Sequence, residues 1–257
     1  MKYIFWAFLT ILAVFAGGFL GRLSYALPRG DAREIWDPAC PFCGRRYGFR
    51  FNLPIFGILL FRGRCPHCGE SAAPRAFFSE ILFGASALLF LIFYDLSPIF
   101  FAYLGVSALL LMLSLIDLDI KEVPHSILLA ILLFGALFFV FSFTDYSLTS
   151  VRWWEHLIGA IAISLPLFLV MMATGGGVGG GDVKLMFCLG FLLGYKAVVV
   201  AFLAGIVFAA LYSLFMIVKY GKSGRFQVPL VPFLSLGFLF AVTYGHYLED
   251  LLFFATV

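Results

Sequence analysis

The sequence predicts an all-α, polytopic membrane protein of about eight transmembrane helices, with a small cysteine-containing cytoplasmic insertion after the first helix. Of its 257 residues, 63% are hydrophobic and only 12% are charged, whereas about 25% are charged in an ordinary soluble domain. Apolar runs of spanning length recur along the chain. A net charge of +3 is explained by membrane topology, so we expect a lipid bilayer as partner and no nucleic acid.

The first expected helix has a single lysine ahead of it and is longer than the core of a signal peptide, so we interpret it as a retained anchor; the alternative is a cleaved signal. The resulting division is a first transmembrane helix in residues 1–25, a polar module in residues 26–76 and a helical membrane domain in residues 77–257. Apolar runs predict the membrane helices, of which the sixth is unusually short, at residues 3–24, 77–94, 98–116, 125–143, 155–173, 183–195, 197–218 and 229–247.

The basic residues predict the orientation. With the segment after the first helix in the cytoplasm, 14 of the 17 Lys and Arg residues fall on that side, and Lys2, Arg152 and Lys196 fall on the other. Basic residues collect on the cytoplasmic side of membrane proteins. We therefore expect a multi-pass membrane protein with both termini outside and the polar module in the cytoplasm.

The polar module contains two CxxC pairs, Cys40 and Cys43 in "CPFC" and Cys65 and Cys68 in "CPHC", with 21 residues between them. This spacing is typical of a zinc ribbon, in which each pair contributes two thiolates to one tetrahedral ion. Four cysteines leave no open coordination position, so we expect a structural zinc. The alternatives are two disulfides, four unrelated thiols, or iron in place of zinc.

Two aspartates stand where the predicted topology opens on the cytoplasmic face. Asp117 begins the polar run "DLDIKE" after the third helix, and Asp182 follows the Gly-rich run "GGGVGGG" before the sixth. Ionisable residues at membrane depth are rare and are functional candidates. Two carboxyl groups in one site hold a single proton between them, which is the arrangement of an aspartic protease dyad. The glycines would let backbone and substrate approach closely.

Other readings of these residues are open at the level of sequence. Asp117 is also interpretable as an interfacial cap in a solvated run, Asp182 as the N-cap of the sixth helix, and the glycines as a linker. At the level of the whole chain, the alternatives are a proton- or ion-coupled transporter that uses intramembrane aspartates, and a non-catalytic scaffold that binds a partner through its zinc module.

The sequence resembles the type IV prepilin peptidases, which are membrane aspartic proteases of the GxGD class. The similarity extends over nearly the whole chain and is carried, in the family's order, by "GGFLGRLSYALPRG" in the first helix, both CxxC pairs, "FNLPIFGILLFRGRC" between them, "DLDIKEVP", "GVGGGDVKLM" and "VPLVPFLSLG". The separation of the two aspartates by 65 positions agrees with this resemblance.

The resemblance implies an aspartic endopeptidase of a bacterial inner membrane that cleaves the basic leader of prepilin or pseudopilin precursors at the cytoplasmic membrane face. The products would serve type IV pili or type II secretion. Its catalytic pair would be Asp117 and Asp182, with an active-site loop of Gly179, Gly180, Gly181 and Lys184. The resemblance also implies N-methylation of the mature N-terminus with S-adenosylmethionine, a cofactor for which we identify no residues. Departures from the family's pattern, "PRAFFSE" before the second helix and Arg50 between the cysteine pairs, both lie in or beside the cysteine module.

Overall fold

The computed structural model of the 257-residue chain describes residues 2–30, 35, 40, 42–46, 64–65, 67–70, 74–144, 151–220 and 228–253. Most of the expected module of residues 26–76, including Arg50, lies outside the described residues. Its four cysteines and some of their neighbours are described. The chain divides into two compact units, residues 1–100 and residues 101–257. In the described residues the regular elements are helices, as expected from the apolar runs, and Arg46 and Arg64 are in isolated β-bridges.

The first unit pairs α1 (Lys2–Arg29) with α4 (Pro74–Tyr94). A methyl group on Gly17 would lie 2.5 Å from the Ser79 carbonyl oxygen, and one on Gly18 would lie 2.6 Å from Oε1 of Glu80. The two helices therefore touch through small residues, which is how apolar helices pack closely in lipid. At the other end of the pair, Lys2 Nζ lies 2.7 Å from Oδ2 of Asp95.

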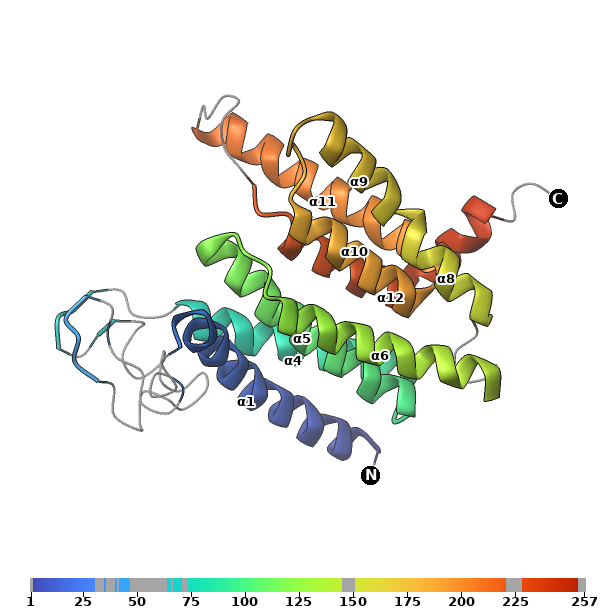
Figure 1. The fold of residues 1–257 in the computed structure, drawn as a ribbon. Helices are drawn as coiled ribbons and strands as arrows, with labels where there is room; N and C mark the ends of the chain where they lie inside the picture. The colour runs from blue at the N-terminus through green and yellow to red at the C-terminus, as the bar shows by residue number, and fades with distance from the viewer. Residues whose placement is uncertain are drawn as a thin grey trace. The chain divides into compact units, whose positions relative to one another are not determined.

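The second unit is a bundle in which α10 packs against α6, α8, α9 and α11, while α11 packs most extensively against α12 (Figure 1). Side chains of α5 reach both α6 and α12, because the Tyr103 ring contacts Phe138 and Phe238. The helices of this unit are α5 (Pro98–Ile120), α6 (His125–Thr144), α8 (Trp153–Ala162), α9 (Ser164–Ala173), α10 (Gly180–Leu193), α11 (Tyr195–Tyr220) and α12 (Val231–Phe253).

The single helix expected at residues 155–173 is interrupted, and α8 ends where α9 begins, around Ile163. Pro166 lies in the first turn of α9 and has no amide hydrogen to donate to the carbonyl one turn earlier. Below the break, α8 meets α10 at Gly159 and Gly190, where a methyl group on either residue would collide with the backbone of the other helix. This contact fixes α10 closely against α8.

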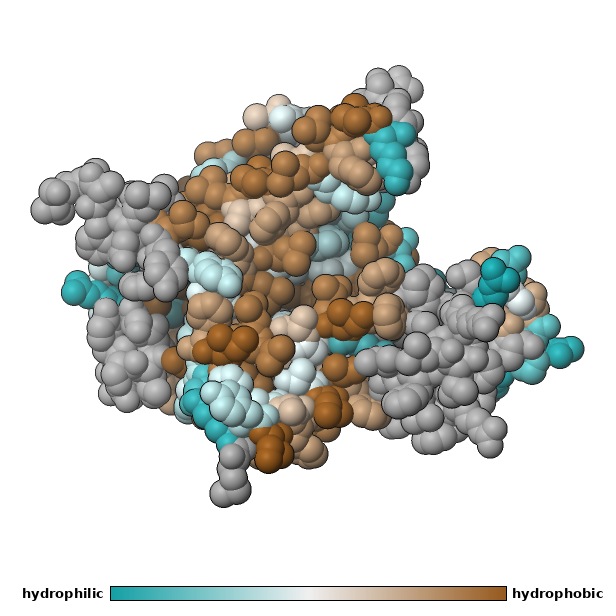
Figure 2. Space-filling view, turned by 180° about the vertical axis from the view of Figure 1, so that it is seen from behind, coloured by the Kyte–Doolittle hydropathy of each residue, from teal (hydrophilic) through white to brown (hydrophobic). Residues whose placement is uncertain are grey.

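The helical surface is strongly apolar. Val218 on α11 is 79% exposed and Leu129 on α6 is 58% exposed, and hydrophobic residues cover most of the described face in Figure 2. Such a surface is stable in contact with lipid rather than water. In the described residues, five helical segments are long and apolar enough to span a bilayer, Lys2–Arg29, Phe77–Tyr94, Pro98–Ile120, Trp153–Ala173 and Tyr195–Lys219.

Two further apolar helices, His125–Phe141 and Val231–Gly245, are shorter, and α10 has 14 residues. The protein is therefore a multi-pass helical membrane protein, and the expected total of about eight spans stays a prediction. Each of the eight predicted apolar runs nevertheless coincides with helix, with the run at residues 155–173 divided between α8 and α9.

Candidate functional site

Asp117 lies in the last turn of α5 and is buried, with only 7% of its surface exposed. Its Oδ2 accepts a hydrogen bond of 3.3 Å from the backbone amide of Val231, the first residue of α12. Ser114, one turn earlier, is 2.8 Å from Ser235 between their hydroxyl oxygens. The aspartate is thus not a member of a solvated run: it is held against the start of another helix, whereas Asp119 two residues later is exposed.

Asp182 lies in the first turn of α10, which begins after Gly179, so the interpretation of Asp182 as the N-cap residue is wrong. Its side chain folds toward Gly179, and a methyl group there would lie 2.9 Å from Oδ2 of Asp182. Burial and then the nearby charge of Asp117 raise the pKa of Asp182 to about 6. The two aspartates, 65 residues apart in sequence, therefore lie in one electrostatic neighbourhood of the second unit.

The three glycines before Asp182 differ in their surroundings. A methyl group on Gly181 would lie 2.5 Å from Cγ2 of Val123, which belongs to the segment between α5 and α6. A methyl group on Gly180 would meet only the Met171 sulfur at 3.8 Å. The missing side chain at Gly181 is therefore required for the loop after Asp117 to contact the start of α10.

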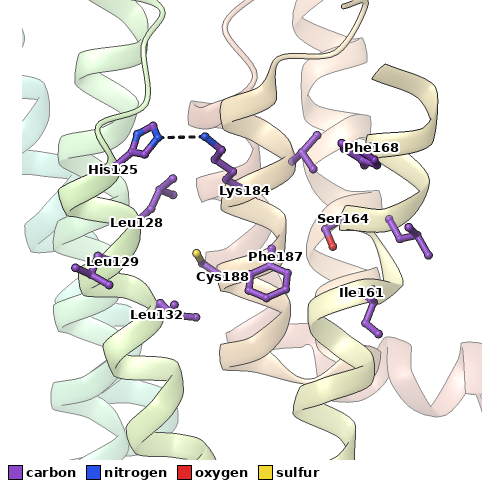
Figure 3. Close-up of a pocket in the computed structure, with 12 residues that line it drawn as sticks. His125, Leu128, Leu129, Leu132, Ile161, Ser164, Phe168, Lys184, Phe187 and Cys188 are labelled. Atoms are coloured by element: carbon purple, nitrogen blue, oxygen red, sulfur yellow. Dashed lines mark hydrogen bonds between the residues drawn. The ribbon is translucent and has the colours of Figure 1, made fainter. Parts of the chain in front are cut away.

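Lys184 points away from this region. Its Nζ lies 3.1 Å from Nε2 of His125, the first residue of α6, and both side chains are exposed (Figure 3). Residues two apart on an α-helix project about 200° from each other, because each residue turns the helix by about 100°. The structure thus brings Asp117, Asp182, Gly179 and Gly181 together and places Lys184 on a different face of α10.

The four cysteine sulfurs of the first unit lie within 4.8 Å of one another. Cys40 Sγ is 3.7 Å from Cys68 Sγ, and Cys43 Sγ is 3.9 Å from Cys65 Sγ. All four are free thiols, since a disulfide requires sulfurs about 2.05 Å apart. A tetrahedral ion with metal–sulfur bonds of about 2.3 Å separates its sulfurs by about 3.8 Å. The donor set therefore fits one four-thiolate metal ion.

Both cysteine pairs have the same backbone. Cys40 N donates to the Arg45 carbonyl at 2.9 Å, and Cys65 N donates to the Glu70 carbonyl at 2.7 Å. The glycine after each pair, Gly44 and Gly69, has a positive φ of 68° and 74°. A left-handed glycine closes each turn tightly enough to direct both sulfurs of the pair to one point. His67 contributes its backbone amide, which is 3.4 Å from Cys65 Sγ.

Two residues near the aspartates Asp117 and Asp182 are not predicted as site residues by the sequence. Val231 contributes a backbone amide, and Val123 contributes a side-chain surface against Gly181. Pro232 after Val231 is the available signal, because a proline in the first turn of an apolar helix marks a start whose free amides need an acceptor. An apolar residue such as Val123 in a short connection gives no comparable signal.

These features define a class: a multi-pass helical membrane protein with two neighbouring carboxyl groups in one unit and a four-thiolate cluster in the other. The model of the type IV leader peptidase family matches residues 104–214, which include both aspartates, and the model of the bacterial peptidase A24 N-terminal domain matches residues 11–94, which include the four cysteines. The chain belongs to the type IV leader peptidase family.

Curated relatives agree with this assignment. The chain is 32% identical over 211 residues to a prepilin leader peptidase/N-methyltransferase of Bacillus subtilis strain 168, covering 80% of this chain and 81% of the relative. A relative of the same name from Burkholderia pseudomallei strain K96243 is 31% identical over 227 residues, covering 86% and 68%. Another from Dichelobacter nodosus is 28% identical over 270 residues, covering 93% and 91%. No solved structure matches the chain.

Proposed function

We propose that the chain is an aspartic endopeptidase that removes the basic leader peptide of type IV prepilin or pseudopilin precursors. The observation that carries this proposal is the placement of Asp117 and Asp182 in one neighbourhood, where burial first and the charge of Asp117 second raise the pKa of Asp182 to about 6. Membership of the leader peptidase family and the names of the relatives support the substrate class. The transporter and scaffold alternatives receive no support from these matches.

Hydrolysis in this site uses the two carboxyl groups in opposite states. Asp117, which accepts the Val231 amide, acts as the ionised member and removes a proton from water as the water attacks the scissile carbonyl carbon. Asp182 acts as the protonated member and donates a hydrogen bond to the carbonyl oxygen. Collapse of the tetrahedral intermediate breaks the carbon–nitrogen bond, and a proton from the dyad leaves with the new amine.

The glycines before Asp182 are proposed to admit the substrate backbone. Gly180 has no close neighbour where a methyl group would stand, so this part of the loop leaves space beside the dyad. Lys184 does not contribute to substrate approach in this proposal, because its side chain contacts His125. We therefore assign substrate approach to Gly179, Gly180 and Gly181 and do not assign Lys184 a catalytic step.

The location proposed for the reaction is the cytoplasmic face of a bacterial inner membrane. The excess of basic residues on the side that carries the two aspartates supports this orientation. A basic leader is retained on that same side for the same electrostatic reason, so its junction with the following apolar helix would reach the dyad at the membrane surface.

The deciding experiment follows cleavage of a prepilin-type precursor in liposomes by mass spectrometry of the leader fragment. We expect Asp117→Asn and Asp182→Asn each to lower the rate by at least about 10²-fold to 10⁴-fold, the usual contribution of a general acid or base. Asp119→Asn is the matched control, because Asp119 is exposed and lies on the same helix. Full activity in both dyad variants, or equal loss in all three, would reject the proposal.

The second activity that we propose is methylation of the new N-terminus with S-adenosylmethionine. It is supported by the two-part name of the relatives and by the match of the N-terminal family model. The same mass spectrometric assay tests it, because a transferred methyl group adds about 14 Da to the mature N-terminal peptide. A mature product without added mass, in the presence of the cofactor, would reject methylation and leave the peptidase proposal intact.

The cysteine cluster is proposed to hold a structural zinc ion. Sulfur separations of 3.7 and 3.9 Å support a tetrahedral four-thiolate site, and such a site has no position for a reacting water. Zinc would supply folding energy to a segment of about 50 residues, a length at which a hydrophobic core by itself rarely gives enough stability. We propose that residues 26–76 form this module, between a first membrane helix in residues 1–25 and a protease domain in residues 77–257.

A further inference from the structure

A groove with a volume of about 480 Å³ lies between α6, the α8–α9 pair and α10 on the second unit. We call it the lateral groove. Its walls include Leu129 and Leu132 of α6, Phe168 of α9 and Phe187 of α10, and its polar end is formed by Lys184 and His125 (Figure 3). Leu129 is 58% exposed, and Phe168 and Phe187 are each 43% exposed.

Each wall of the lateral groove is formed by residues that lie on one face of a helix. On α6, His125, Leu129 and Leu132 are spaced by four and three residues, and on α10, Lys184 and Phe187 are spaced by three. Residues with these spacings lie on one face of a helix. Each wall therefore runs from a polar residue at one end to apolar residues further along.

The lateral groove is separate from the aspartates. Asp182 precedes Lys184 by two positions, so the two side chains project to different sides of α10. The groove lining includes Lys184 and Val183 but neither Asp182 nor Asp117. A ligand in the groove would thus lie beside the proposed dyad without occupying it.

The residues that line the lateral groove favour a ligand that has a negatively charged end and an apolar end. Lys184 and His125 lie 3.1 Å apart at the polar end, and no carboxylate is among the described residues that line the groove. An ammonium has three donors, and its bond to His125 uses one. Ser164, the other polar side chain of the lining, donates to the Ala160 carbonyl of α8 across the break between α8 and α9. The remaining lining is apolar.

We propose that the lateral groove binds one phospholipid with an anionic headgroup, with the phosphate against Lys184 and His125 and an acyl chain along the apolar walls. Basic pockets between membrane helices bind anionic lipid headgroups in this way. The proposal concerns a lipid site and does not depend on the peptidase function.

The length of the lateral groove agrees with a lipid chain better than with a helix. From His125 to Leu132 the α6 wall extends about 11 Å, at about 1.5 Å per residue. One leaflet of the hydrocarbon core is about 15 Å thick, half of the usual 30 Å, whereas a transmembrane helix needs the full thickness and a width of about 10 Å. The walls thus match the upper part of one acyl chain.

The test is native mass spectrometry of the full-length, delipidated protein, titrated with phosphatidylglycerol or phosphatidylcholine of identical acyl chains. We expect one phosphatidylglycerol to bind about tenfold more tightly than phosphatidylcholine, as a charge-assisted contact provides. Lys184→Gln should abolish this preference. Lys219→Gln removes the same charge from the end of α11 and should leave the preference unchanged.

A second pair of variants tests the apolar walls. Leu129→Trp should fill the lateral groove and weaken binding of both lipids at this site, whereas Leu211→Trp, at a side chain that is 59% exposed on α11, should not. Both leucines are exposed, so neither variant should change the melting temperature.

Several results would overturn the proposal. These are equal affinity for the two lipids, a preference that survives Lys184→Gln, unaltered lipid binding in Leu129→Trp, and displacement of phosphatidylglycerol by glycerol phosphate at the same concentration, which would indicate a site for free phosphate. Tighter binding of an apolar helical peptide than of the lipid would indicate a protein partner instead.

Discussion

The backbone amide of Val231 donates a hydrogen bond of 3.3 Å to the carboxylate of Asp117. Val231 is the first residue of α12 and Pro232 follows it, so this amide is one of the few donors that the start of the helix presents. The bond between the hydroxyls of Ser114 and Ser235, one turn along each helix, adds a second link of 2.8 Å. The end of α5 is therefore tied to the start of α12, which fixes the position of Asp117.

The first prediction concerns a variant that lacks the backbone amide hydrogen of residue 231. Val231→Pro eliminates the amide hydrogen while keeping a residue that is tolerated at the start of a helix. A hydrogen bond to a charged group contributes about 1.5–3 kcal/mol, so cleavage of the precursor should fall by roughly 10-fold to 100-fold.

Val231→Ala is the matched control for this change, because it removes side-chain packing but keeps the amide. It should lower the melting temperature and retain cleavage. Equal activity of the proline and alanine variants, at temperatures where both are folded, would mean that the amide does not position Asp117.

The second prediction concerns pH. Asp182 precedes the apolar part of α10, and its pKa is raised to about 6 by burial first and by Asp117 second. The dyad works with Asp182 protonated, so cleavage should decline as the pH rises through about 6 and recover on acidification. Asp117→Asn removes the charge contribution but leaves the burial, so the pKa of Asp182, followed by carboxyl NMR, should decrease part of the way toward its ordinary value.

The same titration affects stability with a defined sign. The pKa of Asp182 is higher in the folded chain than in the unfolded one, so the folded state holds the proton more tightly. The resulting stabilisation is present below pH 4 and is lost as the pH rises to about 6. Melting temperatures of the wild type and Asp182→Asn should diverge across this window, and parallel curves would contradict the assignment.

The third prediction compares alanine substitutions at two adjacent glycines, Gly180 and Gly181. A methyl group on Gly181 would lie 2.5 Å from Val123, whereas one on Gly180 would meet its nearest neighbour at 3.8 Å. Gly181→Ala should therefore force Val123 and the loop after Asp117 to move, with a cost of about 1–3 kcal/mol for overpacking and a large loss of cleavage. Gly180→Ala should fold normally and retain more activity.

The double variant Gly181→Ala with Val123→Ala extends this test. Removing the two methyl groups of Val123 eliminates the contact at 2.5 Å but leaves its Cβ at 2.8 Å, so the double variant should recover only part of the activity that Gly181→Ala loses. If the two single glycine variants behave alike, or if shortening Val123 gives no recovery, the contact between this loop and α10 is not what constrains position 181.

The fourth prediction concerns the metal. The purified protein should contain one zinc per chain, measured by plasma mass spectrometry, and Cys40→Ser or Cys65→Ser should lose it. Cys188→Ser is the control, because Cys188 lies on α10 and outside the cluster. Iron in place of zinc would correct the identity of the metal, and a full zinc content in both cluster variants would remove the site altogether.

The positions of the apolar helices could be predicted because each depends on a local run of side chains. The runs expected at residues 98–116 and 197–218 correspond to α5 and α11. The cysteine cluster could also be predicted from the sequence, since two CxxC pairs are the usual source of four thiolates for one tetrahedral ion. The interruption at Ile163 is a local effect that hydropathy does not register, although Pro166 gave a signal for it.

The sequence by itself determined that this chain enters a membrane, where its helices lie and which cysteines can share an ion, because hydrophobicity and short spacings are properties of neighbouring residues. Only the tertiary structure decided which functional groups meet. Asp117 accepts the Val231 amide across 114 residues, Asp182 lies close enough to Asp117 for that charge to raise its pKa, and Lys184 contacts His125. The pairings of Asp182 and Lys184 depend on how α10 packs between its neighbours, through contacts such as Gly159 with Gly190. The pairing of Asp117 depends on the meeting of α5 with α12, which the bond between Ser114 and Ser235 also marks. Such long-range packing leaves no periodic trace in the sequence.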